Sequence, residues 1–387
     1  MQKKSTILIL SPFFSPNIGG VETHLDDLVT HLRRRRIGNS VITYMPITAR
    51  VKAPFRQHAD GSTIYRLPWP GFDLFFRLER FYLAEFLYLF MGVFLFSFIY
   101  LMAKRKEVKV IHGHGLSCAV ATVILSRIYR CKPIVSLHTI YRFSESPWLG
   151  WMAKRVLIFV DKILVLAKGC KEDLIAIGVP PERIVVYTNW IDLRIFSPID
   201  GQECKRRLGL EADRFVALFV GRFTKEKGVE LVLATASLAQ EIMFILVGEG
   251  PMAELARLRA RAQPNVRIVG WVRSEELPVY YNAADVLLWG SVDQDYLGRA
   301  SMSALACGLP VIISNKTDYF GKMRPVSFAV QEIGFMLEPD PEIVAEKLRF
   351  LSQHRDLIYR KRVSCRNYAL KNFSEKNAEA IIQSYFK

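Results

Sequence analysis

The chain has 387 residues, of which 51% are hydrophobic and 23% are charged. This composition suffices for ordinary globular cores, and the length suggests about two domains. The formal net charge is +16, so the expected partner is anionic: phosphates, a membrane surface or nucleic acid. Nucleic acid is disfavoured, because no recognised nucleic-acid-binding module accompanies the charge.

The first apolar run, Thr6 to Leu10, comes after a basic start and so has some features of a signal peptide. It is too short for one, and Pro12 and Pro16 interrupt the next stretch of chain, so we expect a buried strand in a cytoplasmic protein. The cysteines form no Cys-x-x-Cys pair, and reduced, mostly buried thiols are expected. They are Cys118, Cys131, Cys170, Cys204, Cys307 and Cys365.

Short apolar runs alternate with helix-length segments along the chain, which predicts parallel sheets with crossover helices. The fold class is therefore α/β, with two doubly wound Rossmann-like domains facing across a cleft. The predicted strands of the first half are Thr6–Leu10, Ser40–Tyr44, Thr63–Leu67, Val108–Ile111, Pro133–Leu137, Lys162–Leu166 and Ile184–Tyr187. Those of the second half are Phe215–Val220, Met243–Val247, Arg267–Val269, Val286–Trp289, Val311–Ile313 and Gly334–Leu337.

A polar stretch near residues 195–207 separates the two sets of strands and is the best candidate for a domain boundary. We therefore predict an N-terminal domain over residues 1–200 and a C-terminal domain over residues 201–370. A last segment, 371–387, begins near Ser374, which can cap a helix.

The segment Phe86 to Ala103 holds 18 residues without a charge and is followed by Lys104-Arg105-Lys106. Three structures fit this pattern: a helix packed against the sheet, a helix lying in a membrane interface, and a membrane span. The buried helix is favoured, because Val108–Ile111 comes directly afterwards as the next strand.

Candidate site residues in the first half come after predicted strands. Gly19-Gly20 precedes a helix, where a backbone can approach a ligand and N–H groups favour an anion. A plain strand-to-helix turn explains such a pair equally well. His112, His114 and His138 come at the ends of two other strands; cleft packing is the alternative for each, and zinc-like spacing is lacking.

Two segments in the second half predict an anion site. Arg222 and Lys227 come after the strand Phe215–Val220, at the edge where open α/β sheets bind ligands. Asp295-Tyr296-Leu297-Gly298 lies between a buried strand and the start of a helix, whose positive end also favours an anion. Two cations and a helix N-terminus together indicate a diphosphate.

These segments, with the run Ala304-Leu305-Ala306-Cys307-Gly308-Leu309-Pro310-Val311, resemble glycosyltransferase family 4, whose members are retaining sugar-nucleotide transferases of GT-B fold. The resemblance covers nearly the whole chain. It implies a UDP- or GDP-sugar donor, a lipid-linked or polysaccharide acceptor, no metal or other cofactor, and a last helix that crosses back to the first domain.

The resemblance also assigns residues to roles. It implies that Gly19 and Gly20 face the donor diphosphate and that His138 lies near the transferred sugar. Cations at Arg222 and Lys227 would stabilise the departing diphosphate. The turn containing Gly250 would lie near the nucleotide base. Other donor contacts are implied for Asp295, Tyr296, Leu297, Gly298 and Ser303, with Asp295 also catalytic.

Two of these positions depart from the family pattern, which has a glutamate at both. Asp295 is one methylene shorter, and Ser303 cannot hold the ribose hydroxyls with a charged carboxylate. An alternative is therefore a non-catalytic relative that binds sugar nucleotides or membranes. Asp293 and Asp295 also spell the Asp-x-Asp of metal-dependent transferases, but the surrounding two-domain pattern argues against a metal site.

Basic clusters concentrate in the first half: Arg33 to Arg36, Lys104 to Lys106, and Lys154-Arg155. A run of like charges is usually a solvated face. Next to aromatic helices, such clusters instead favour peripheral docking on an anionic membrane. The sequence leaves both interpretations open.

Overall fold

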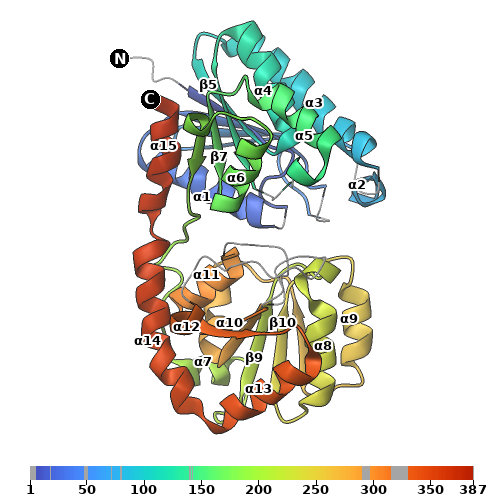
Figure 1. The fold of residues 1–387 in the computed structure, drawn as a ribbon, viewed down its shortest axis with the longest axis vertical. Coiled ribbons are helices and arrows are strands. Elements are labelled where there is room, and N and C mark those ends of the chain that lie inside the picture. The colour runs from blue at the N-terminus through green and yellow to red at the C-terminus, as the bar shows by residue number, and fades with distance from the viewer. Residues whose placement is uncertain are drawn as a thin grey trace. The chain divides into compact units, whose positions relative to one another are not determined.

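A computed structural model describes residues 6–17, 19–47, 51–70, 72–78, 81–138, 141, 143–289, 297–314 and 330–386. The chain divides into two compact units (Figure 1). The first contains Met1–Asn189 together with Glu375–Lys387, and the second contains Trp190–Ser374. The chain thus passes from one unit to the other twice.

The first unit contains an eight-stranded sheet in the order β3-β4-β2-β1-β5-β6-β7-β8. All neighbouring strands are parallel except β3, which runs antiparallel to β4. The bounds are β1 Thr6–Leu10, β2 Asn39–Tyr44, β3 Arg56–Ala59, β4 Ser62–Leu67, β5 Val108–His114, β6 Lys132–Leu137, β7 Lys162–Val165 and β8 Ile184–Val186. The sequence missed β3, because this edge strand is polar and mostly exposed and so carries no apolar signal.

The helices of this unit cover both faces of its sheet. They are α1 Gly20–Arg34, α2 Phe72–Leu78, α3 Tyr82–Lys104, α4 Leu116–Tyr129, α5 Pro147–Leu157, α6 Lys168–Ala176 and α15 Glu379–Phe386. Helix α1 lies on one face, and the neighbouring helices α3 and α4 lie on the other (Figure 1). All six cysteines are buried and free, as expected.

The C-terminal segment of the first unit packs on α1. Arg34 pairs with Glu375 and Arg35 pairs with Glu379, while Arg33 lies 3.3 Å from Asp60. These ion pairs offset part of the charge of Arg33, Arg34 and Arg35, and docking of the cluster Arg33 to Arg36 on a membrane stays a prediction. The three arginines pair with carboxylates that arrive from distant parts of the sequence.

The second unit contains a six-stranded, all-parallel sheet in the order β11-β10-β9-β12-β13-β14. Its strands are β9 Val216–Val220, β10 Met243–Val247, β11 Val266–Gly270, β12 Val286–Trp289, β13 Val311–Ser314 and β14 Gly334–Leu337. Its helices are α7 Gly201–Arg207, α8 Val229–Leu238, α9 Ala253–Ala260, α10 Leu277–Ala283, α11 Arg299–Ala306, α12 Val330–Ile333, α13 Pro341–Gln353 and α14 Arg355–Asn372.

Alternate residues of β9 belong to two separate apolar clusters, one on each face of this sheet. Val216 and Leu218 contribute to the first cluster, and Ala217 and Phe219 contribute to the second. This alternation results from the two-residue period of a strand. A sheet covered on both faces explains why its strands appear in the sequence as continuous apolar runs.

The first unit ends at Asn189, before the predicted limit of residue 200. The reason is packing: Ile191 and Phe196 belong to an apolar cluster of the second unit. Phe373 is part of the same cluster, and its carbonyl accepts a hydrogen bond from the Ile191 amide (3.2 Å). The chain accordingly re-enters the first unit at Glu375 rather than at residue 371.

Replacing Tyr385 tests how strongly the C-terminal segment stabilises the first unit. Tyr385 is 3% exposed, and its hydroxyl lies 2.8 Å from Nδ1 of His112. We expect Tyr385→Ala to lower the free energy of unfolding by about 3 kcal/mol or more, because a large buried side chain is removed. Phe386 is 62% exposed, so Phe386→Ala should cost at most about 0.5 kcal/mol. Equal losses in the two variants, measured by urea unfolding, would contradict this assignment.

Candidate functional site

Parallel strands place their carboxyl ends at one edge of a sheet, and the predicted site residues come after such ends in both units. In the first unit, His112 and His114 lie at the end of β5 and His138 comes directly after β6. Gly19 and Gly20 begin α1 in the segment after β1. In the second unit, Arg222 and Lys227 come after β9.

The three predicted histidines are brought together in a hydrogen-bonded cluster. His114 Nδ1 lies 2.8 Å from His138 Nε2, and the two rings are stacked with centroids 5.1 Å apart. His112 Nε2 lies 2.8 Å from the Ser136 hydroxyl, and its Nδ1 faces Tyr385. The cluster therefore links the ends of two strands to the C-terminal helix.

Two further members of this cluster were not predicted from the sequence. The His24 ring, on α1, lies 5.2 Å from the ring of His138, and its Nε2 is 3.3 Å from the Tyr187 hydroxyl. Both are buried. A sequence signal for His24 was nonetheless present, because it lies four residues after Gly20, one helical turn along the same face of α1.

Burial sets the charge of the cluster. It lowers the pKa of His112 to about 3 and the pKa of His138 to about 4, and it lowers the pKa of His114 well below its ordinary value. All three rings are therefore neutral at pH 7. Each can donate one hydrogen bond and accept another, so His138 suits a sugar hydroxyl better than it suits a phosphate charge.

The space next to the Cα atom of Gly20 is open. In the described part of the chain, no atom lies within 4 Å of where a Cβ at Gly20 would be. Packing therefore does not require glycine here, and the backbone at the start of α1 remains open to approach.

The loop after β9 is held rigidly around Phe223, which is fully buried. The Phe223 amide donates to the Glu249 carbonyl (2.8 Å), and its own carbonyl accepts from the Met252 amide (3.0 Å). Arg222, the preceding residue, is exposed. Lys227 is half-buried and precedes Gly228, the N-cap of α8, whose φ is 74°. The hydrogen bonds of Phe223 thus hold the backbone of the loop that carries Arg222 and Lys227.

The turn after β10 packs directly against this loop. A Cβ at Gly248 would lie 1.9 Å from the Gly221 carbonyl oxygen, and one at Gly250 would lie 2.7 Å from the Phe223 carbonyl oxygen. Close backbone packing therefore explains both glycines. A contact between Gly250 and a nucleotide base stays a prediction.

The residues around α11 divide into three groups. Gly298 caps α11, whereas the predicted donor residue Leu297 is 6% exposed and belongs to the apolar core. Ser303 is 5% exposed, and its side chain hydrogen-bonds with the buried Tyr281. Asp295, Tyr296 and Asp293 lie outside the described residues.

Within the described ranges, no three His, Cys, Asp or Glu side chains are arranged to hold a metal ion. The Asp293-x-Asp295 pattern falls outside those ranges, so the expectation that no metal is needed stays a prediction.

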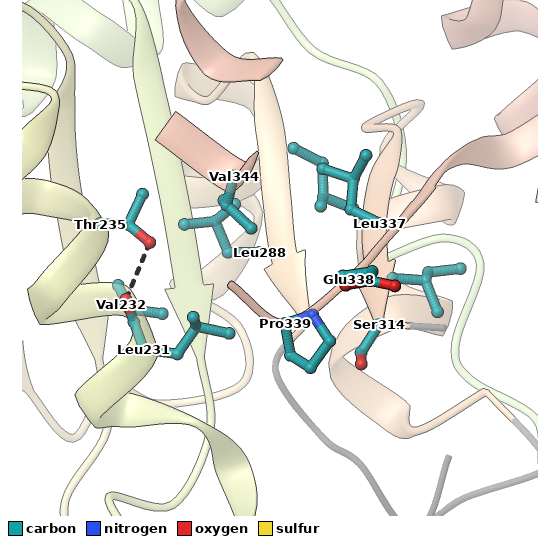
Figure 2. Close-up of a pocket in the computed structure, with 11 residues that line it drawn as sticks. Leu231, Val232, Thr235, Leu288, Ser314, Leu337, Glu338, Pro339 and Val344 are labelled. Carbon is teal, nitrogen blue, oxygen red and sulfur yellow. Dashed lines mark hydrogen bonds between the residues drawn. The ribbon is translucent and has the colours of Figure 1, made fainter. Parts of the chain in front are cut away.

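A pocket lies between α8, α13 and the carboxyl ends of β12, β13 and β14 (Figure 2). Its lining is mainly aliphatic, and the Thr235 hydroxyl in it donates to the Leu231 carbonyl (2.8 Å). Glu338 is the one charged residue among the described residues that line it. A diphosphate needs cations, so this pocket does not match the predicted donor site.

The histidine cluster predicts a pH dependence of stability. The folded-state pKa values of His112 and His114 lie below the unfolded value of about 6.5. Below that pH the unfolded chain binds protons that the folded chain does not, so stability should be full above about pH 6.5 and fall as the pH drops. In urea unfolding we expect a nearly constant free energy between about pH 7.5 and about pH 6.5, and then a loss of about 1 kcal/mol per pH unit for each histidine down to about pH 5.

The matched variants are His112→Gln and His58→Gln, because His58 is exposed on β3. The first should reduce the pH dependence and the second should preserve it. An unfolding free energy that stays constant over this range contradicts the expectation.

Two family profiles match the chain. "Glycosyltransferase Family 4" matches residues 18–195, and "Glycosyl transferases group 1" matches residues 214–354. Among solved structures, sucrose-phosphate synthase from Thermosynechococcus elongatus has a TM-score of 0.78 at 20% identity, covering 99% of this chain and 98% of that one. Anabaena HepE in complex with UDP has a TM-score of 0.70 at 18% identity, covering 98% and 99%.

The chain is also similar to the GPI3 subunit of phosphatidylinositol N-acetylglucosaminyltransferase from Saccharomyces cerevisiae. The two are 25% identical over 354 residues, which cover 84% of this chain and 73% of that protein. The two profiles together cover both units, and the solved structures share the two-sheet GT-B architecture over nearly the whole length. This chain is a glycosyltransferase and belongs to glycosyltransferase family 4, with a group 1 glycosyl transferase domain in its second unit.

Proposed function

We propose that this glycosyltransferase moves a sugar from a UDP- or GDP-linked donor to a hydroxyl of a lipid-linked or polysaccharide acceptor, with retention of the anomeric configuration. The observation that carries the proposal is the loop after β9. Buried Phe223 and two close-packed glycines fix the backbone of this loop. The loop carries the exposed side chain of Arg222 at the edge of the sheet where α/β proteins bind ligands. The complexes of HepE with UDP and with UDP-glucose support a nucleotide-sugar donor.

In this reaction the bond between the anomeric carbon and the donor phosphate breaks, and a bond to the acceptor oxygen forms on the same face of the sugar. Negative charge then develops on the departing diphosphate, which takes up the acceptor's proton directly or through water. Arg222 and Lys227 would stabilise that charge, since preorganised cations act most strongly where charge develops. We assign His138 a neutral hydrogen bond to the transferred sugar, and Asp295 a contact with the sugar hydroxyls.

A lipid-linked acceptor is supported by the yeast relative and by its counterpart from Arabidopsis thaliana, which is also a phosphatidylinositol N-acetylglucosaminyltransferase component. The Arabidopsis protein is 22% identical over 351 residues, covering 88% of this chain and 72% of that protein. We further propose a cytoplasmic location, peripheral to the membrane that carries such an acceptor.

Ser303 favours a second candidate function. Its side chain is buried against Tyr281, where the family carries an acid expected to hold the ribose. A relative with this change could bind sugar nucleotides without transferring the sugar. The two functions differ in a simple assay: a transferase releases UDP or GDP in the presence of acceptor, whereas a binding protein shows only a thermal shift with the nucleotide sugar.

Replacing the two basic residues tests the assignment of the leaving group. We expect Arg222→Ala and Lys227→Ala each to lower turnover by about a hundredfold or more, because a charge that stabilises the diphosphate is lost. Lys225 is the matched control, since it is an exposed cation of the same short 3-10 helix as Lys227. Lys225→Ala should retain most activity. Wild-type turnover in Arg222→Ala and Lys227→Ala, measured as diphosphate release, would rule the assignment out.

Chelation tests the proposal that no metal is required. If side chains and helix N-termini neutralise the diphosphate, dialysis against EDTA should leave diphosphate release largely intact. Complete loss of turnover on chelation, restored by Mn²⁺, would support the Asp293-x-Asp295 metal site instead.

A further inference from the structure

The inner face of the long apolar helix α3 packs against the sheet of the first unit. A Cβ at Gly92 would lie 2.6 Å from the Trp69 ring and 2.7 Å from the Tyr44 ring. The Tyr44 hydroxyl, which is fully buried, donates to the Leu89 carbonyl (2.9 Å) and accepts from the Val93 amide (3.0 Å). A side chain of β2 therefore bonds to the backbone of the helix itself.

The opposite face of α3 is a continuous row of exposed apolar side chains, which we name the outer stripe. It consists of Leu83, Leu87, Met91, Leu95, Ile99 and Met102, whose exposed fractions range from 41% to 68%. Spacings of three and four residues place all six on one helical face. The mean hydropathy of α3 reaches 2.2 over 18 residues, and it is the one helix in the described part of the chain long and apolar enough to cross a membrane.

The outer stripe is not isolated, because α3 packs against α4, and α4 packs against α5. These two helices expose further large apolar side chains: Ile128 on α4 (54%), and Trp148 (64%) and Trp151 (55%) on α5. Scattered exposed apolar residues are normal on a soluble protein, but a contiguous surface indicates an interaction site.

Positive charge borders this apolar surface. Residues 81–160 contain ten Lys and Arg against three Asp and Glu. Arg105 and Lys106 come after the end of α3, Arg127 is in the last turn of α4, and Arg155 is in the last turn of α5; all four are exposed. Because these helices each lead into the next parallel strand, their ends lie at the same edge of the sheet.

We propose that the outer stripe and its basic border dock on an anionic lipid bilayer, with α3 lying in the plane of the interface. Apolar residues along one face, tryptophans and flanking cations are the features of a helix that binds there. Spanning the bilayer would require α3 to abandon the contacts of Tyr44 and Trp69. A second copy of the chain would bring two positively charged surfaces together, which disfavours a dimer through this face. The inference rests on the peripheral location proposed above, and vesicle binding is measured separately from diphosphate release.

The test is flotation of the full-length protein with vesicles of phosphatidylcholine alone and of phosphatidylcholine with about one-third phosphatidylglycerol. We expect anionic lipid to raise binding by about tenfold or more, and about 0.5 M salt to reverse most of that gain. Leu95→Glu combined with Ile99→Glu should lower binding by about tenfold or more, since two charges are placed in the stripe. Arg105→Glu combined with Lys106→Glu should remove most of the gain from anionic lipid.

The matched control is Leu255→Glu combined with Leu258→Glu, which changes two exposed apolar residues of α9 in the second unit (39% and 60% exposed). It should bind like wild type, and thermal melts should show that every variant is folded. The proposal is overturned if the control loses binding as strongly as the stripe variant, or if wild type binds neither vesicle. It is also overturned if sedimentation shows that the stripe mediates self-association or capture of a purified protein partner without lipid binding.

Discussion

Parallel pairing of strands is the constraint on which the rest of this structure depends. Strands that all run the same way must be joined by crossover helices, so each strand ends in a turn at the same edge of its sheet. This is why His114 and His138 contact each other although they come from different parts of the sequence, and why the Gly248 turn meets the loop of Arg222. Most of the candidate site residues that the structure describes gather at these edges.

Close packing at these edges fixes backbones and leaves selected side chains available. Gly248 and Gly250 are glycines because a neighbouring backbone occupies the space a Cβ would need, and the buried ring of Phe223 holds the adjoining loop. The result is a rigid support beneath Arg222. In the proposed reaction, a backbone fixed in advance would help to position this cation at the charged leaving group.

The first unit combines two environments that serve different purposes. Its histidine cluster is buried and neutral, so His138 can take part in hydrogen bonding without attracting a phosphate. Tyr385 completes the cluster from the far end of the chain, which makes the C-terminal helix part of this core. On the face covered by α3, the same unit instead exposes apolar and basic side chains, which form the surface proposed to dock on a bilayer.

The sequence by itself determined the α/β class, nearly every strand, and the placement of Arg222 and Lys227 after β9, because apolar periodicity is a local property of the chain. It missed β3, whose polar and mostly exposed residues carry no apolar signal although they pair with β4 at the sheet edge. Tertiary structure alone decided that Arg34 and Arg35 pair with Glu375 and Glu379, that His24 joins the other histidines, and that Ser303 is buried against Tyr281. Each of these depends on contacts between residues distant in sequence. Tertiary structure also decided which face of α3 is buried and which is exposed. The helix is apolar on all sides, so the side chains that pack against it determine which side meets the sheet.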